Sequence, residues 1–270
     1  MSRFTLATLC IEDEPVAAIG VVDSFYLLPD SLPSLIKHTT VKDILVSWPD
    51  TFPILEQFAQ NNSKGQNVPG GSQVNSDNAQ LLTPIMYPNK RVAVGANYTG
   101  DGSKCRKVCE NAVLHKTSDY ESCRSRKDCQ NPRSTKQFDW EYLSCRNLIP
   151  AGNELQVDLM RGKAQDTMAP CGPFIVPAKF LPDTSDLRIR LSVNDKPMMD
   201  ASTSEMLYKC DEQLSIISSY MTLEPGDIVF TGSPSGSAHV HGDCWLKPGD
   251  HILAEIEGIG RLDVTMIADN

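Results

Sequence analysis

The sequence lacks the features that mark several large classes of protein. No apolar run is long enough to span a membrane, and the N-terminal stretch alternates and carries charges, unlike a signal peptide. A positive net charge is also lacking: 34 acidic and 25 basic residues give −9, so no overall field attracts nucleic acid or an anionic membrane. We therefore expect a protein that binds neither nucleic acid nor membranes.

The sequence also lacks the regular cysteine spacing of a disulfide framework. There are nine cysteines, an odd number, and four of them stand alone along the chain: Cys10, Cys171, Cys210 and Cys244. Isolated cysteines are typical of buried thiols in a reducing compartment. This pattern predicts a cytoplasmic protein.

What is present is the composition of an ordinary globular protein, with 40% hydrophobic and 22% charged residues. Alternating periodicity predicts two strands, over residues 3–9 and 17–28, and helical periodicity predicts two helices, over residues 40–48 and 51–60. A polar loop is predicted over residues 61–80. Further along, residues 90–98 predict a buried strand, 186–198 a strand with a turn at Asn194-Asp195, and 203–221 a helical region.

The C-terminal part contains a small repeat. The segments "EPGDIVFTG" (224–232) and "KPGDHILAE" (247–255) each place Pro-Gly-Asp before a strand. Proline fixes the first position of a turn and glycine accepts a positive φ, so the chain reverses and enters a sheet. Residues 251–267 then predict a hairpin with Gly258 and Gly260 at its turn. The whole pattern is that of a β-rich α+β protein.

Four stretches resemble the fumarylacetoacetate hydrolase family. The longest are "EPGDIVFTGSPSG" (224–236) and "LKPGDHILAEIEGIGRL" (246–262). The others are "GANY" (95–98), which follows "YPNKRVAV", and "RGKAQDTMAPCGPFIVP" (161–177). The resemblance covers residues 83–98 and about 136–267.

The resemblance implies a fold and a domain division. We expect a mostly β, α+β chain with a mixed β-sandwich or roll as its catalytic domain and a small N-terminal α/β domain. The small domain and its linker are predicted over residues 1–82, and the catalytic domain over 83–270, with an anomalous stretch at 100–145. The resemblance also implies a homodimer.

The activity implied by the resemblance is metal-dependent chemistry at C–C bonds. Members hydrolyse or decarboxylate 2-oxo acids and β-diketones of the acylpyruvate kind, or isomerise related dienoates, with Mg²⁺, Mn²⁺ or Ca²⁺. A hard cation chelated by two substrate oxygens stabilises the enolate that forms when the bond breaks. The small-molecule partner is therefore expected to be a 2-oxo acid or β-diketone.

The resemblance also assigns roles to residues of this chain. Lys163 and Ser233 are the candidate catalytic residues, and Ser233 stands where the family usually has Thr. Arg146, Thr231 and Gly232 are the candidate substrate-binding residues. Without the resemblance, residues 231–236 would be interpreted as a tight loop after a strand.

The metal ligands are where the chain departs from the family. Glu141 in "KQFDWE" matches the first metal-binding carboxylate, but "YLSCRN" follows directly, with Leu143 where a second Glu is expected and Tyr142 where an Asp is expected. Only one of three carboxylates remains. Because a hard cation needs several oxygen ligands, we expect weak metal binding.

The anomalous stretch holds Cys105, Cys109, Cys123 and Cys129 in a dense run of Lys and Arg. The spacings are wider than the C-x2-C pairs of structural zinc sites, and His115 would be a fifth ligand. Aromatic residues are almost absent, so a solvated basic face is favoured over a nucleic-acid site. A zinc or nucleic-acid module remains a remote alternative.

An out-of-frame reading offers a third interpretation. The codons for residues 111–132, read one nucleotide later, permit "MPFFIKPPTTNVVGPGKTVKIP", which resembles the family between its G-x-N-Y strand and its D-W-E motif. We infer that residues from about 100 to 132 are out of frame and that a segment is missing between Glu141 and Tyr142. The chain is then either derived from a complete enzyme or a catalytically impaired member of the family.

Overall fold

The computed structural model describes residues 3–35, 37–63, 73–95, 97–99, 115–117, 138–139, 144–145, 159–164, 168–181, 183–238 and 240–268. The chain divides into two compact units. Unit 1 consists of residues 1–89, 171–184 and 223–227. Unit 2 consists of residues 90–170, 185–222 and 228–270.

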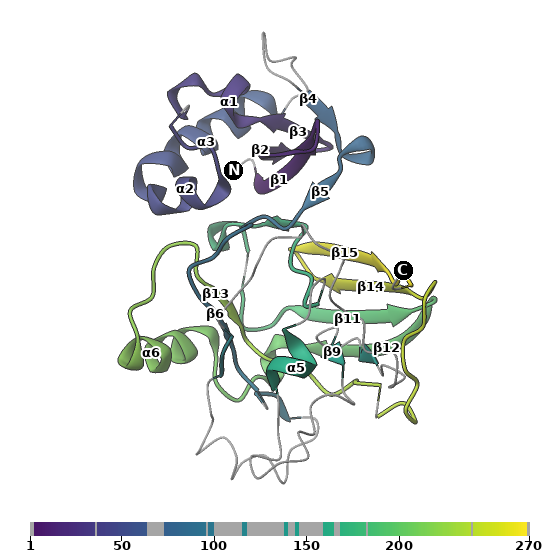
Figure 1. Ribbon diagram of the computed structural model, residues 1–270. Coiled ribbons are helices and arrows are strands. Elements are labelled where there is room, and N and C mark those ends of the chain that lie inside the picture. Colours follow the sequence, from purple (N-terminus) through teal and green to yellow (C-terminus); the bar gives the residue numbers. More distant parts are fainter. Residues whose placement is uncertain are drawn as a thin grey trace. The chain divides into compact units, whose positions relative to one another are not determined.

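Unit 1 is built on an antiparallel sheet in the order β10-β1-β2-β3-β4, with β5 also paired to β1 (Figure 1). The strands are β1 (Thr5–Ile11), β2 (Glu14–Val21), β3 (Ser24–Leu27), β4 (Gln73–Asn75), β5 (Leu81–Leu82) and β10 (Phe174–Ile175). Glu12 and Asp13 both have positive φ, 51° and 65°, in the two-residue turn between β1 and β2. Such mirror-image turns match the twist of the strands they connect.

The helices of unit 1 cover this sheet, with α2 in contact with β1 and α3 in contact with β2. They are α1 (Leu28–Ser31), α2 (Val41–Val46) and α3 (Trp48–Asn62), with short 3-10 helices η1 (Pro33–Leu35), η2 (Ser76–Asn78) and η5 (Ala178–Phe180). In α3 the buried residues follow helical spacing: Thr51, Leu55, Phe58, Ala59 and Asn62. The two helices predicted at 40–48 and 51–60 are therefore confirmed.

An aromatic cluster forms around the buried side chain of Phe4 in unit 1. The Phe4 side chain is 1% exposed, and its ring centroid lies 5.1 Å from that of Phe180, 5.6 Å from Phe52 and 6.5 Å from Trp48. The Phe4–Phe180 pair meets edge to face, which is a favoured geometry for aromatic rings. This cluster joins the start of β1 to α3 and η5.

A reciprocal cap begins α2. The Asp43 N–H donates to the Thr40 Oγ1 at 3.1 Å, and the Thr40 N–H and Oγ1–H both donate to the Asp43 Oδ2, at 3.0 Å and 2.8 Å. Partial burial acts to raise the pKa of Asp43, but hydrogen bonds from Thr40 and Thr39 outweigh it and hold the pKa below its usual value. The charged carboxylate therefore stabilises this end of α2.

Replacing Asp43 by Asn is expected to lower the free energy of unfolding at pH 7 by about 0.5–1.5 kcal/mol, because the cap loses its charged acceptor. Since the folded pKa of Asp43 is depressed, its contribution is complete above the unfolded pKa of about 3.9 and is lost as the pH falls through the folded pKa. Urea denaturation at pH 7, 5 and 3 should show wild type and variant converging only at the lowest pH. A difference that is independent of pH would contradict this account.

Unit 2 contains a four-stranded antiparallel sheet in the order β12-β11-β14-β15 and a three-stranded sheet in the order β13-β6-β7 (Figure 1). A two-stranded ladder, β8-β9, completes its described strands. Their bounds are β6 (Arg91–Ala93), β7 (His115–Thr117), β8 (Phe138–Asp139), β9 (Ser144–Cys145), β11 (Arg188–Val193), β12 (Lys196–Ser202), β13 (Ile228–Phe230), β14 (His251–Ile256) and β15 (Gly260–Thr265).

Two of the predicted turns are confirmed in the four-stranded sheet. Asn194 and Asp195 have φ of 49° and 63° in the turn between β11 and β12, and Gly258 has φ of 71° between β14 and β15. The core beneath this sheet consists of Met168, Leu191, Val193, Met198, Met199, Ala238, Leu246 and Ile252. The outward face of the sheet carries the ion pair of Arg188 with Asp200 and a contact between the His251 Nε2 and the Asp263 carboxylate. His251 thus lies, partly buried, on the outward face of the sheet.

The helices of unit 2 are α5 (Leu159–Lys163), α6 (Cys210–Tyr220) and the 3-10 helix η6 (Thr203–Glu205). In α6 only Gln213 and Ile217 are buried, at the i, i+4 spacing of one helix face. Among the described residues, no helix combines the length and the apolar character that a membrane crossing requires.

Candidate functional site

Two loops meet at one end of a parallel pair of strands in unit 2. Strands β6 and β13 are parallel, with Val92 opposite Val229 and Phe230 opposite Ala93, and the Val94 N–H donates to the Phe230 carbonyl at 2.9 Å. Because parallel strands point the same way, the loops that follow them leave at the same edge. These loops carry the sequence motifs "GANY" (95–98) and "TGSPSG" (231–236).

The buried side chain of Asn97 connects these two loops. Asn97 is 1% exposed, and its Nδ2 donates to the Thr231 carbonyl at 2.9 Å and to the Tyr208 carbonyl at 3.1 Å. Its Oδ1 accepts from the Tyr208 N–H at 2.9 Å, and its own carbonyl accepts from the Leu207 N–H at 2.8 Å. One side chain thereby joins three segments of the chain.

The second loop fits against its neighbours only because of its glycines. Gly232 has φ of +92°, and a Cβ atom at this position would lie 3.1 Å from the Asn97 Cβ and 3.2 Å from the Val94 carbonyl oxygen. At Gly236 a Cβ would lie 3.0 Å from the Met198 carbonyl oxygen. The loop is therefore packed against the 95–98 loop at one end and against β12 at the other.

A backbone donor of this loop has no protein partner in the described part of the chain. None of the residues that the structure describes accepts a hydrogen bond from the Gly232 N–H, and Gly232 is only partly buried. A glycine amide in such a loop suits an oxyanion such as a carboxylate.

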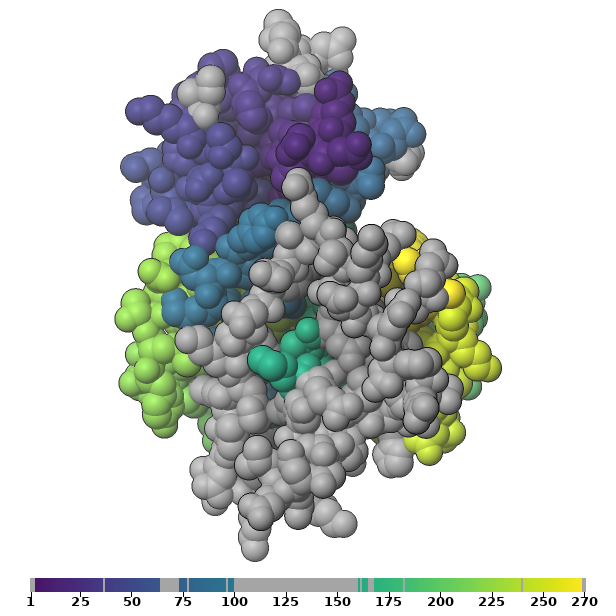
Figure 2. All heavy atoms as spheres, viewed as in Figure 1, coloured from purple at the N-terminus to yellow at the C-terminus, as the bar shows by residue number. Residues whose placement is uncertain are grey.

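The structure describes four of the six predicted site residues. Thr231, Gly232 and Ser233 lie together in the loop after β13, and each is partly buried. Lys163 is the last residue of α5, is partly buried, and belongs to a helix that contacts β9. Glu141 and Arg146 lie outside the described residues. Figure 2 shows the segment around Lys163, in teal, on the face toward the viewer.

Asn97 is the residue of the site to which the sequence analysis assigned no role. The sequence predicts "GANY" as part of a buried strand over residues 90–98, yet its asparagine makes the contacts that order the site. A polar residue directly after an apolar strand, within a motif, was the available signal. Its partners Tyr208 and Thr231 are distant in the sequence, so local patterns could not indicate them.

The described residues do not form a metal centre. Among them, no group of three or more His, Cys, Asp or Glu side chains is placed to hold a cation. In the segment "HVHGDC", the His241 Nε2 lies 2.8 Å from the Met198 carbonyl oxygen, Asp243 and Cys244 are exposed, and His239 falls outside the described residues. Cys105, Cys109, Cys123 and Cys129 also fall outside them, so the zinc alternative stays a prediction.

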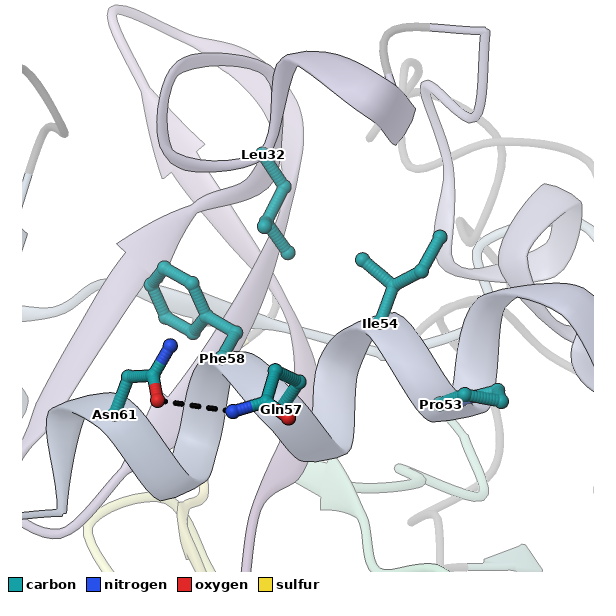
Figure 3. A pocket seen from close by; sticks show the side chains of 6 residues that line it. All are labelled: Leu32, Pro53, Ile54, Gln57, Phe58 and Asn61. Carbon is teal, nitrogen blue, oxygen red and sulfur yellow. Dashed lines mark hydrogen bonds between the residues drawn. The ribbon is translucent and has the colours of Figure 1, made fainter.

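An apolar groove lies on α3 of unit 1, but the side chains that line it differ in chemistry from those of the candidate site. It encloses about 410 Å³ and is lined by Leu32, Pro53, Ile54, Gln57, Phe58 and Asn61 (Figure 3). The Gln57 Nε2 donates to the Asn61 Oδ1 at 3.0 Å across its rim. None of these six side chains is ionisable, so the groove offers no acid–base or nucleophilic group.

Comparison with protein families gives one match in this chain. Residues 142–267 match the model described as "Fumarylacetoacetate (FAA) hydrolase C-terminal". The match includes the loop after β13 and Lys163, and it begins one residue after Glu141. That is the point at which the sequence analysis placed a missing segment.

Two curated relatives are similar to this chain over a large part of its length. An uncharacterized protein of Staphylococcus epidermidis is 30% identical over 223 residues, which cover 70% of this chain and 72% of the relative. An uncharacterized protein of Pyrococcus abyssi is 48% identical over 151 residues, covering 53% of this chain. The chain spans only 64% of the length of that archaeal relative.

Two solved structures share the fold. Fumarylacetoacetate hydrolase from Exiguobacterium antarcticum superimposes with a TM-score of 0.67 at 22% identity, covering 98% of this chain and 99% of the other. Maleylpyruvate hydrolase from Sphingobium, solved with manganese(II) and pyruvate, gives a TM-score of 0.63 at 19% identity, covering 97% and 98%. At these identities the likeness is one of fold, and it confirms the predicted mostly β, α+β architecture.

Proposed function

The chain belongs to the fumarylacetoacetate hydrolase family, and from this membership we propose that it is an enzyme acting on a C–C bond of an acylpyruvate-like 2-oxo acid or β-diketone. The observation that carries the proposal is the meeting of the "GANY" and "TGSPSG" loops at the carboxyl ends of β6 and β13. The Sphingobium structure with pyruvate supports a 2-oxo acid as the ligand class.

In this proposal the loop after β13 binds the substrate carboxylate. The Gly232 N–H and the hydroxyl groups of Thr231 and Ser233 are the donors, since a carboxylate is bound best by several hydrogen-bond donors at once. Arg146 is proposed to bind the substrate through its charge. Lys163 is proposed to stabilise the negative charge that develops on the substrate when the C–C bond breaks.

We also propose that a divalent cation binds, with Mg²⁺ first and Mn²⁺ or Ca²⁺ as alternatives, through Glu141. The residues that the structure describes supply no cluster of side chains for this cation. A single carboxylate holds such a cation weakly. The manganese in the Sphingobium structure supports the choice of a divalent ion.

This proposal also covers the oligomeric state and the cellular location of the protein. We propose a homodimer in the cytoplasm whose only ligands are small molecules and a cation. Analytical ultracentrifugation tests the dimer, because a sedimentation coefficient of a 29.7 kDa monomer at micromolar concentration would contradict it.

The activity is tested by incubating the purified chain with oxaloacetate and with a short acylpyruvate, each with and without MgCl₂ or MnCl₂. We expect pyruvate to form only with added cation, and EDTA to abolish its formation because the cation is weakly held. Lys163→Met serves as the control that separates this activity from a contaminating enzyme.

A second candidate function is that of a catalytically impaired family member. The family match that begins directly after Glu141 favours it, because the remaining carboxylate ligands are then missing. Absence of turnover with every substrate and cation, while oxalate still binds, would select this alternative.

A further inference from the structure

The carboxamide of Asn97 holds the peptide unit that carries the Gly232 N–H. We infer that Asn97 is a positioning residue: it orients the Thr231–Gly232 peptide so that the Gly232 N–H is presented to the carboxylate of a bound 2-oxo acid. The orienting role stands on the contacts of Asn97 alone. The identity of the ligand rests on the proposed function.

The orientation of the Asn97 amide is fixed by its partners. Its Nδ2 faces two carbonyl oxygens, those of Thr231 and Tyr208, and its Oδ1 faces the Tyr208 N–H. With the amide reversed, an oxygen would face two carbonyl oxygens and an NH₂ group would face an N–H. The Asn97 amide therefore has a single allowed orientation, in which its Nδ2 donates to the Thr231 carbonyl.

Burial makes this contact costly to break. Asn97 is 1% exposed, so a Thr231 carbonyl that left it would lose its hydrogen bond and leave a buried donor unpaired. The approach is also close, because a Cβ on Gly232 would lie 3.1 Å from the Asn97 Cβ. A larger residue at this position would force the peptide and the asparagine slightly apart.

The direction of the Gly232 N–H follows from peptide geometry. The Thr231–Gly232 peptide is trans, so its C=O and N–H point in opposite directions. Because the C=O points at Asn97, the N–H points away from it. None of the described residues accepts that N–H, which leaves it for a ligand oxygen.

Two substitutions separate positioning from general stability. Asn97→Asp keeps the shape of the side chain but removes both N–H donors of the Nδ2 group. Asn97→Ser shortens the side chain so that it no longer reaches the Thr231 carbonyl, and it introduces no charge. Gln213→Met is the matched control: Gln213 is 3% exposed and its Nε2 donates at 2.7 Å to the same Tyr208 carbonyl, but it does not bind Thr231. Thermal unfolding verifies that each variant is folded.

The Gly232 N–H can be observed directly by NMR in the full-length chain. The sequence contains only two Thr-Gly pairs, Thr99-Gly100 and Thr231-Gly232, so labelling threonine with ¹³C at the carbonyl and glycine with ¹⁵N gives two correlated signals. Without ligand, the Gly232 signal should move in Asn97→Asp and Asn97→Ser and stay in place in Gln213→Met. If it stays in place in the folded Asn97 variants, the positioning role is overturned.

Oxalate, the smallest analogue of a 2-oxo carboxylate, then tests the ligand. In wild type and in Gln213→Met, oxalate with MgCl₂ should shift the Gly232 signal saturably and slow its hydrogen exchange. In the Asn97 variants the affinity should fall about 10- to 100-fold, as for the loss of a hydrogen bond to a charged group.

The two possible failures are distinguishable. If oxalate binds wild type and leaves the Gly232 signal unchanged, the presentation of this N–H to a carboxylate is overturned while the proposed function stands. If oxalate does not bind at all, the proposed function and the ligand half of the inference fail together. The ligand-free spectra decide the orienting role of Asn97 in either case.

Discussion

Replacing Gly232 by alanine is expected to lower the free energy of unfolding by about 2–6 kcal/mol and to abolish the binding of oxalate. Two costs add. A non-glycine residue at φ of +92° is strained, at a cost of about 1–3 kcal/mol, and the new Cβ would lie within 3.2 Å of both Asn97 and the Val94 carbonyl oxygen, at a cost of about 1–3 kcal/mol. Urea denaturation and oxalate titration measure the two effects.

Gly249 provides a matched control for this substitution. It lies in the Pro-Gly-Asp turn before β14, has nearly the same φ of +91°, and a Cβ there would meet no atom within 4 Å. Gly249→Ala should therefore show the backbone strain alone, about 1–3 kcal/mol, and leave oxalate binding unchanged. Equal losses for the two variants would mean that the close approach of Gly232 to Asn97 has no energetic weight.

Replacing Phe4 by alanine is expected to destabilise unit 1 by about 3–5 kcal/mol. The side chain is 1% exposed and its ring contacts Trp48, Phe52 and Phe180, so its removal leaves a cavity lined by three other rings. The partners come from α3 and η5, which makes the cluster a cross-link between separate segments. Urea denaturation followed by tryptophan fluorescence reports this loss, because Trp48 belongs to the cluster.

Phe4→Leu is the matched variant, since it keeps most of the apolar volume and removes only the ring–ring contacts. Its loss should be clearly smaller, about 1–2 kcal/mol. A loss for Phe4→Ala below about 1 kcal/mol would show that the neighbouring rings collapse into the cavity without cost.

The sequence predicted the elements whose signals are local. The two helices near residues 40–60, the Asn194-Asp195 turn and the hairpin over 251–267 are all present. Each depends on periodicity, on a capping residue or on a turn residue within a few positions. The buried strand predicted at 90–98 is shorter, because β6 ends at Ala93 and the chain then turns through the loop that holds Asn97.

The relations between distant segments could not be predicted in this way. Phe174–Ile175 adds a strand to β1, and residues 223–227 pack with the N-terminal part of the chain. In that packing a Cβ on Gly226 would lie 3.0 Å from the Lys42 side chain, and the Asn89 Nδ2 donates to the Glu224 Oε2 at 3.1 Å. Periodicity carries no information on which distant segment a strand or turn will meet.

For the candidate site, the resemblance to the family was more informative than the periodicity of the sequence. It singled out residues 231–233, which the structure places in one loop beside "GANY". The role of Asn97 depends on a burial that only the folded chain reveals. Glu141 and Arg146 fall outside the described residues, and their roles stay predictions.

The parallel pairing of β6 with β13 has a consequence for how the chain is made. Arg91 pairs with Ile228, so the ribosome must synthesise most of the polypeptide before the two loops of the site can meet. Non-local pairing of this kind is slow to form, because the entropy of closing the long intervening chain is lost before the contacts are gained. Until then the Asn97 amide and the backbone edge of β6 that pairs with β13 lack their partners, and unpaired strand edges of this kind favour aggregation. A transcript that stops before Ile228 would yield no candidate site, however well its earlier part was encoded.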